Sequence, residues 1–278
     1  MEHLGRRAGP YDQHTRRPQG RYFASHTQIP IIIFNMSRPN RITLRNIANK
    51  GRHALWDVWN SLRRRFRRPV PGEFQPYYFT RPDRYPWLFG FAAERLGSRP
   101  SPRILSFGCS RGEEVFSLRK YFPAATLKGI DINPRNIARC RARMRTENLS
   151  NMTFEIAATT EGESTSSYDA IFCLAVLVNG DLTTSAAQRS DPVLYFDTFE
   201  QIVSDFARCL KPDGLLVLHT TNFRFCDTAA AGDFDVVYEA DPEYLAPDVL
   251  FDRNNRLMSG ERQQYRAVAF QKRMTTAP

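Results

Sequence analysis

The feature that most constrains this chain is a short apolar strand that runs directly into a glycine-containing turn and then into a helix. The segment is Arg103-Ile-Leu-Ser-Phe-Gly108-Cys-Ser-Arg-Gly112-Glu-Glu. In doubly wound sheets, ligands bind beyond the carboxyl ends of the strands, and the first such turn is the usual place. Gly108 and Gly112 would let a ligand approach the main chain closely. The segment therefore predicts a ligand site at this turn.

Strand-like and helix-like segments alternate on both sides of the turn, which is typical of a parallel sheet with helices on both faces. Strands are expected at residues 103–107, 126–131, 152–157, 169–175, 215–221, 234–238 and 265–271. Helices are expected at residues 87–96, 113–121, 134–147 and 195–210. No clear helix separates the last two strands. The pattern predicts an α/β fold, a Rossmann-like doubly wound, mostly parallel seven-stranded sheet with an antiparallel C-terminal strand.

Charge is distributed unevenly along the chain. Residues 1–70 hold 15 Lys and Arg against 3 Asp and Glu, whereas the remainder holds 24 against 26. Residues 1–40 lack apolar periodicity and are expected to be a disordered basic tail, with Met36 as an alternative start. Residues 41–75 are expected to form a basic amphipathic helix and a linker. The helix, at residues 41–68, either packs on the body or contacts RNA or an acidic surface such as a membrane. Residues 76–278 are then the folded domain.

The cysteines and the hydropathy pattern limit the classes of protein to which this sequence can belong. The five cysteines form no Cys-x-x-Cys pair, and zinc-ligand spacing is absent among the Cys and His residues. These features favour reduced thiols in a cytoplasmic protein, with no metal site. No run of about 18 apolar residues is present, so no transmembrane segment is expected.

Two nucleotide cofactors compete for the turn after the first strand. The dinucleotide fingerprint would need glycines at Ser110 and Glu113, and a Glu at the helix start would repel a pyrophosphate. S-adenosylmethionine (SAM) carries an ammonium and a sulfonium group and no phosphate, so acidic residues suit it. Glu113 has a second interpretation, because Ser110-x-x-Glu113 matches a capping box. Asp131 ends the second strand, where a carboxylate can accept both ribose hydroxyls. Asn133 and Pro134 are good residues for starting the next helix.

Over about residues 103–225 these segments resemble class I SAM-dependent methyltransferases. The matching parts are the Gly108–Gly112 turn, the acidic end at Asp131, a fourth strand Tyr168-Asp-Ala-Ile-Phe-Cys173, and Leu210-Lys-Pro-Asp-Gly-Leu-Leu, which places a turn before the fifth strand. The first motif also resembles that of chemotaxis-receptor glutamate methyltransferases, which implies SAM contacts at Glu113 or Glu114. That narrower resemblance ends after the fourth strand, where Leu174-Ala-Val replaces an Arg-Asn-containing stretch.

The resemblance implies a SAM site around the first, second and fourth strand ends. The expected cofactor-binding residues are Ser106, Phe107, Gly108, Cys109, Ser110, Gly112, Glu113, Asp131, Ile132, Cys173 and Leu174. Methyl transfer needs a general base only when the acceptor has a proton to lose. The weak candidates for such a base are Asp181, His219 and Tyr195, of which Asp181 lies in a long polar loop at residues 179–192.

The acceptor is approached by elimination. The tetrapeptide of amino methylation on bases (Asn or Asp-Pro-Pro-Tyr or Phe) is absent after the fourth strand, and so is the Pro-Cys pair of cytosine methylation. The first hypothesis is an enzyme that methylates a small-molecule or carbohydrate-type acceptor. An RNA methyltransferase that uses the basic extension and a non-catalytic scaffold with this fold are the alternatives. An NAD-dependent oxidoreductase comes a distant third.

Overall fold

The computed structural model describes residues 74–75, 80–245, 249–260 and 264–274. The expected basic tail, the alternative start at Met36 and the amphipathic helix at residues 41–68 lie outside the described residues. The predictions for that part of the chain, and the boundary of the folded domain at residue 76, stay predictions.

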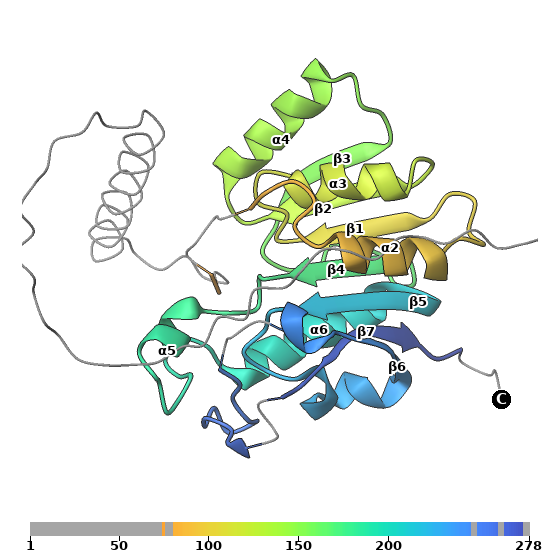
Figure 1. The fold of residues 1–278 in the computed structure, drawn as a ribbon. Coiled ribbons are helices and arrows are strands. Elements are labelled where there is room, and N and C mark those ends of the chain that lie inside the picture. Colours follow the sequence, from red (N-terminus) through yellow and green to blue (C-terminus); the bar gives the residue numbers. More distant parts are fainter. Residues whose placement is uncertain (1–73, 76–79, 246–248, 261–263, 275–278) are drawn as a thin grey trace, which may run out of the picture. The chain divides into compact units, whose positions relative to one another are not determined.

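A seven-stranded sheet lies at the centre of the described domain (Figure 1), with the strand order β3-β2-β1-β4-β5-β7-β6. Strands β3, β2, β1, β4 and β5 pair in parallel, and β7 runs antiparallel to both β5 and β6. This arrangement confirms the predicted fold class. The strand bounds are β1 (Arg103–Phe107), β2 (Thr126–Asp131), β3 (Met152–Ile156), β4 (Tyr168–Leu174), β5 (Leu210–His219), β6 (Phe234–Glu239) and β7 (Ala267–Lys272).

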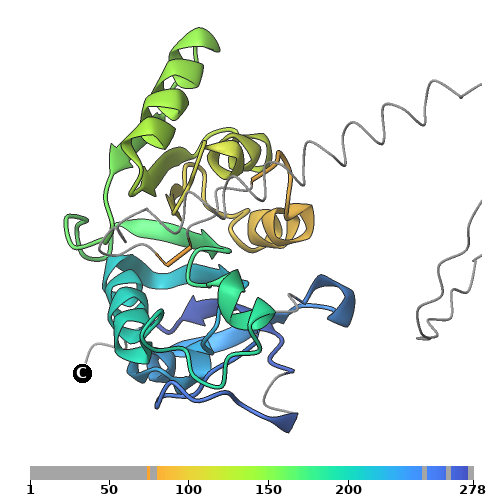
Figure 2. The ribbon, with the colours of Figure 1, turned by 90° about the vertical axis from the view of Figure 1, so that its left-hand side faces the viewer.

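Helices cover both faces of the sheet. Figures 1 and 2 place α2 and α3 on one face and α6 on the other. Two buried clusters follow this division: one contains side chains of α2, α3 and α4, and the other contains the buried face of α6. The helix bounds are α2 (Pro86–Arg95), α3 (Glu113–Tyr121), α4 (Pro134–Thr146), α5 (Gly180–Thr184) and α6 (Phe196–Cys209), with short 3-10 turns at Phe225–Asp227, Ala229–Asp233 and Pro242–Tyr244.

Local sequence accounts for the elements that frame the sheet. All seven residues of β4 are buried, as expected for the central strand of a parallel sheet covered on both faces. Helix α6 buries one face at helical spacing, through Phe199, Val203 and Phe206 among others. The predicted start of α4 is confirmed, because the Asn133 side chain accepts a hydrogen bond from the Arg135 N–H at 2.9 Å, with Pro134 in the first turn.

Two connections differ from the prediction. The expected turn at residues 211–214 lies inside β5, which begins at Leu210. Leu210 pairs with Tyr168 and Leu215 with Ala170, so extra residues bulge out of the strand, with Asp213 at φ 60°. The expected polar loop at residues 179–192 contains α5, because the Asn179 side chain accepts a hydrogen bond from the Asp181 N–H at 3.0 Å and caps a short helix.

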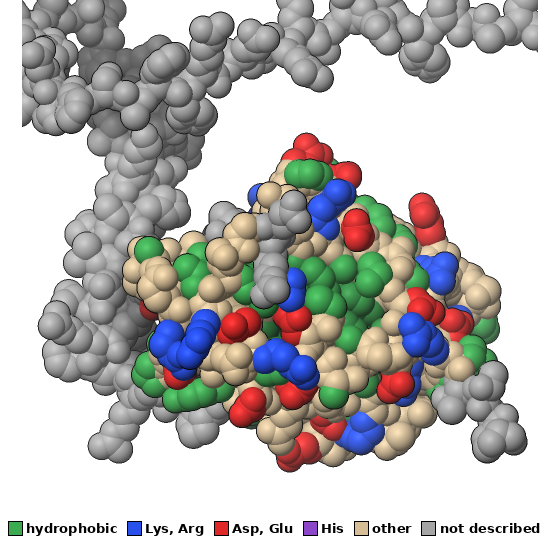
Figure 3. Space-filling model, turned by 90° about the horizontal axis from the view of Figure 1, so that it is seen from below, with side chains coloured by type: hydrophobic (Ala, Val, Ile, Leu, Met, Phe, Trp, Pro, Cys, Tyr) green, Lys and Arg blue, Asp and Glu red, His purple; other side chains and the backbone are tan. Residues whose placement is uncertain are grey.

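The described surface carries both signs of charge. On the face seen in Figure 3, Lys and Arg side chains alternate with Asp and Glu around a central hydrophobic area. This agrees with the near balance of acidic and basic residues after residue 70. Among the described helices, none combines the length and apolar character needed to cross a membrane.

Candidate SAM site

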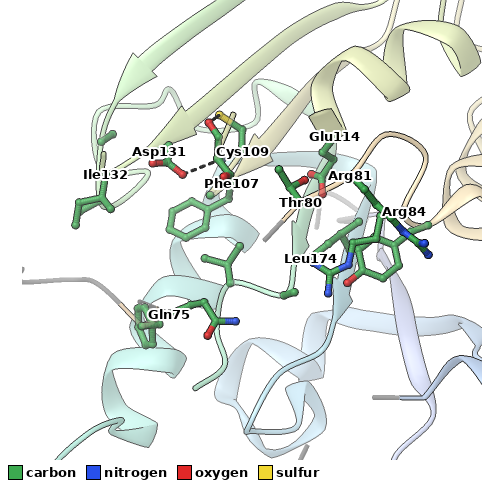
Figure 4. Close-up of a pocket in the computed structure, with 18 of the residues that line it drawn as sticks. Gln75, Thr80, Arg81, Arg84, Phe107, Cys109, Glu114, Asp131, Ile132 and Leu174 are labelled. Atoms are coloured by element: carbon green, nitrogen blue, oxygen red, sulfur yellow. Dashed lines mark hydrogen bonds between the residues drawn. The ribbon is translucent and has the colours of Figure 1, made fainter. Parts of the chain in front are cut away.

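A pocket opens at the carboxyl ends of β1, β2 and β4, where the strand order reverses between β1 and β4. This edge is the usual ligand site of doubly wound sheets. The empty space within the pocket is about 920 Å³, which includes open solvent. Figure 4 shows an elongated arrangement, with Asp131 and Ile132 at one end and Glu114, Arg81 and Arg84 at the other.

The glycine turn supplies the floor of the pocket. Gly108 has φ 72°, and a Cβ there would lie 2.5 Å from a methyl carbon of Val176. A side chain at this position would therefore be strained and would collide with the segment after β4. Gly112, at φ 85°, does not line the pocket, and a Cβ there would lie 2.7 Å from a ring carbon of Phe116. Glycine at position 112 therefore allows α3 to pack closely and does not serve the approach of a ligand.

Asp131 holds the turn in place at the other end of the pocket. Its Oδ2 accepts a hydrogen bond from the Ser110 N–H at 2.8 Å. Its Oδ1 accepts from the Asn133 N–H at 2.8 Å and from the Asn136 amide at 3.2 Å. A carboxylate oxygen can accept two hydrogen bonds, so Oδ2 retains capacity for a ligand hydroxyl.

Glu114 is a partly buried carboxyl group of the site. Its Oε1 accepts a hydrogen bond from the Ser106 hydroxyl at 2.8 Å. Burial raises the pKa of Glu114 to about 7, although the Ser106 hydrogen bond and the charge of Arg84 act in the opposite direction. The group is therefore poised to ionise when a cation enters the pocket.

Glu113 lies away from the pocket. Its carboxylate pairs with Arg143 at 3.0 Å, and the Arg143 guanidinium lies 3.9 Å from the centre of the Phe116 ring. The capping box with Ser110 does not form, because Gly112 occupies the N-cap position and no side chain caps α3. Of the two neighbouring glutamates, the one that lines the pocket is Glu114.

Seven of the residues predicted to bind the cofactor line the pocket: Phe107, Gly108, Cys109, Ser110, Asp131, Ile132 and Leu174. Ser106 and Cys173 are buried outside its lining, where Ser106 supports Glu114 and burial raises the pKa of the Cys173 thiol. Gly112 and Glu113 lie outside it for the reasons given above. The structure thus places seven of the eleven predicted residues in the lining of the pocket and the other four outside it.

The weak catalytic candidates do not line this pocket. The His219 ring is buried, with its two nitrogens 2.9 Å from the Tyr244 carbonyl oxygen and 2.8 Å from the Thr220 hydroxyl. Tyr195 is an exposed residue that precedes α6, and Asp181 lies in the first turn of α5.

One wall of the pocket comes from a segment for which the sequence offered no motif. The residues of this wall are Phe74, Gln75, Thr80, Arg81, Arg84 and Tyr85. Its first residue is tied to the body, because the Asn179 side chain donates a hydrogen bond to the Phe74 carbonyl at 3.1 Å, and the Asn179 N–H donates to Asn222 at 2.6 Å. The pattern of aromatic and basic residues before α2 was the available indication.

Two buried polar atoms of the pocket residues lack a hydrogen-bond partner in the described structure. They are the Ser110 hydroxyl and the side-chain carbonyl of Gln75. Unpaired buried polar groups are rare, so each indicates a partner that a ligand can supply. With two carboxyl groups and a glycine floor, this donor and acceptor set fits SAM, whose cationic groups and ribose hydroxyls match it.

A family model described as "Methyltransferase domain" matches residues 99–265, which is more than half of the chain. The chain belongs to this family. The matched residues form a methyltransferase domain. The match concerns the general methyltransferase domain, and the resemblance to chemotaxis-receptor enzymes stays a prediction. Among the described residues of this methyltransferase, no group of His, Cys, Asp and Glu is arranged to hold a metal ion.

The similarity to solved structures is low in both identity and extent. A putative sarcosine dimethylglycine methyltransferase from Galdieria sulphuraria is 20% identical, with a TM-score of 0.38, and the match covers 48% of this chain and 43% of that one. A geranyl diphosphate C-methyltransferase from Streptomyces coelicolor is 15% identical, with a TM-score of 0.36, and the match covers 48% and 44%. The methyltransferase thus spans less than half of these chains. No curated protein sequence matches it significantly.

Proposed function

We propose that the pocket binds SAM with its nucleoside toward Asp131 and its amino acid group toward Glu114, and that the enzyme methylates a small-molecule acceptor. The observation that carries this orientation is the separation of the two carboxyl groups at opposite ends of one pocket. Asp131 would accept the ribose hydroxyls. Glu114 would receive the ammonium group, because burial raises the pKa of its carboxyl and a cationic partner favours the ionised form.

The apolar lining fits the remaining parts of the cofactor. Ile132, Ala157 and Ala158 lie at the Asp131 end and would contact the adenine. Leu174, Ala175 and Val176 follow β4 and would face the activated methyl group, which SAM supplies. The protein's contribution is then alignment of the acceptor with that methyl group in a site that excludes water.

A small-molecule acceptor is favoured by the shape of the site. The wall that begins at Phe74 lies over the same pocket, which leaves a confined space beside the cofactor. The basic extension on which the RNA alternative depends lies outside the described residues. We propose that residues 76–278 form the methyltransferase domain, with Phe74 and Gln75 joining its pocket.

The proposed orientation predicts the effect of removing Asp131. An Asp131→Ala variant should bind S-adenosylhomocysteine (SAH), the demethylated product of SAM, about 10- to 100-fold more weakly than the wild type, because hydrogen bonds to a charged group are lost. Isothermal calorimetry measures this change. The matched control is Asp197→Ala, which removes an exposed carboxylate in the first turn of α6 and should leave the affinity unchanged. Equal SAH affinity of wild type and Asp131→Ala would contradict the orientation.

A further inference from the structure

Two arginines line the SAM pocket at the Glu114 end (Figure 4). Arg84 acts on Glu114, whose pKa its charge lowers against the effect of burial. Arg81 is exposed and lines the same pocket, and none of the ion pairs of the described residues includes it. At this end of the pocket, the two guanidinium groups therefore carry one more charge than the carboxylate of Glu114 can neutralise.

A charge balance sets the chemistry of the second ligand. Among the described residues that line the pocket, the side chains that carry a formal charge are Arg81, Arg84, Glu114 and Asp131, which cancel when both carboxyl groups are ionised. SAM contributes one carboxylate, one ammonium and one sulfonium group, so the loaded pocket carries a net positive charge. Charges in a partly buried pocket are screened weakly, so an anionic acceptor is favoured over a neutral or cationic one.

We propose that Arg81 and Arg84 form an anion-binding subsite for a carboxylate of the acceptor, so that the enzyme methylates a small organic acid. The proposal rests on the proposed function and deepens it. Guanidinium groups match carboxylates in geometry and bind them through paired hydrogen bonds. The neighbouring side chains of Phe74, Tyr85 and Phe89 supply apolar surface for the body of such a molecule.

The carboxylate could come from either of two molecules, and the experiment distinguishes them. SAM also carries a carboxylate on its amino acid group. The acceptor is favoured as the source because the net positive charge remains after the carboxylate of SAM has been counted. Methylthioadenosine, which keeps the nucleoside and sulfur of SAH but lacks its amino acid group, reports binding that is independent of the cofactor carboxylate.

The test titrates the full-length protein, loaded with sinefungin, with benzoate and with benzamide, which share a shape and differ in charge. Sinefungin carries an ammonium group in place of the sulfonium of SAM and so keeps the positive charge that SAH lacks. The wild type should bind benzoate about 10-fold more tightly than benzamide. Arg81→Gln should remove most of this preference while leaving the SAH affinity within about twofold. Arg84→Gln should remove it as well and should also weaken SAH binding, because the charge of Arg84 lowers the pKa of Glu114. Arg84→Lys, which keeps the charge and loses the fork, should retain part of it. Arg139→Gln, an exposed arginine of α4, is the control with the same change of charge.

The other outcomes overturn the proposal in distinguishable ways. If Arg81→Gln binds SAH about 10-fold more weakly and methylthioadenosine normally, the subsite belongs to the cofactor carboxylate. If the wild type binds SAH and shows no preference for benzoate, the anionic acceptor is wrong and the SAM site stands. If the folded wild type binds no SAH, the proposed function fails, and the acceptor subsite fails with it.

Discussion

A Gly108→Val variant is expected to fold and to bind SAH more than about 100-fold more weakly than the wild type. Gly108 adopts φ 72°, a region that a β-branched residue rarely enters. Its Cβ would also lie 2.5 Å from Val176, which lines the same pocket. Relief of the contact must displace either the glycine turn or the segment after β4, and both line the SAM pocket. Calorimetry with SAH measures the loss.

A second glycine separates the loss of the site from a general effect of substitution. Gly162 lies in a turn after β3, has no atom within 4 Å of an added Cβ, and is outside the pocket. Gly162→Val should therefore keep the SAH affinity of the wild type. Gly108→Ala, which adds a single carbon, should fall between the wild type and Gly108→Val. Near-normal SAH binding by a folded Gly108→Val protein would show that the turn does not form the cofactor floor.

The sheet and its helices could be predicted from the hydrophobic periodicity of the sequence. The buried run of β4 and the apolar face of α6 are each dominated by burial, so local pattern and tertiary structure agree. The bulge in β5 is different. Lys211, Pro212 and Asp213 have the composition of a turn, and only pairing with β4 at Tyr168 and Ala170 shows that the strand continues on both sides of them.

The residues that line the pocket could be predicted where the ends of the strands determine their position. They could be predicted less well where the direction of a side chain determines whether it lines the pocket. Asp131 and the Gly108 turn are fixed by the ends of β1 and β2. Whether Glu113 or Glu114 lines the pocket depends on which side of the first turn of α3 faces the sheet. Glu113 instead forms an ion pair with Arg143 of α4. The wall from Phe74 to Tyr85 could not be foreseen, because its place over the pocket depends on contacts with Asn179, distant in sequence.

Glu114→Gln is expected to make the ligand-free enzyme more stable at about pH 8, by up to about 3 kcal/mol. Burial raises the pKa of Glu114 from 4.5 to about 7 in the folded state. The stability that this group contributes is therefore fully present below about pH 4.5 and is lost as the pH rises through about 7. The amide stays neutral throughout, so the variant should lack this loss. Chemical denaturation of both proteins at about pH 5 and pH 8 measures the difference.

The same substitution should weaken the binding of SAH, because the ionised Glu114 is the proposed partner of the ammonium group. At about pH 8 the loss should be about 10-fold or more, whereas methylthioadenosine should bind both proteins equally. Wild-type affinity for SAH should fall between about pH 7.5 and pH 6 as Glu114 takes up its proton, and the variant should show a flat profile. Glu113→Gln, which loses only the pair with Arg143, should keep the wild-type profile. A stabilised variant with unchanged SAH affinity would place the ammonium group elsewhere. If Glu114 both lowers the stability of the ligand-free protein and increases the affinity for SAH, its role is to bind the ligand.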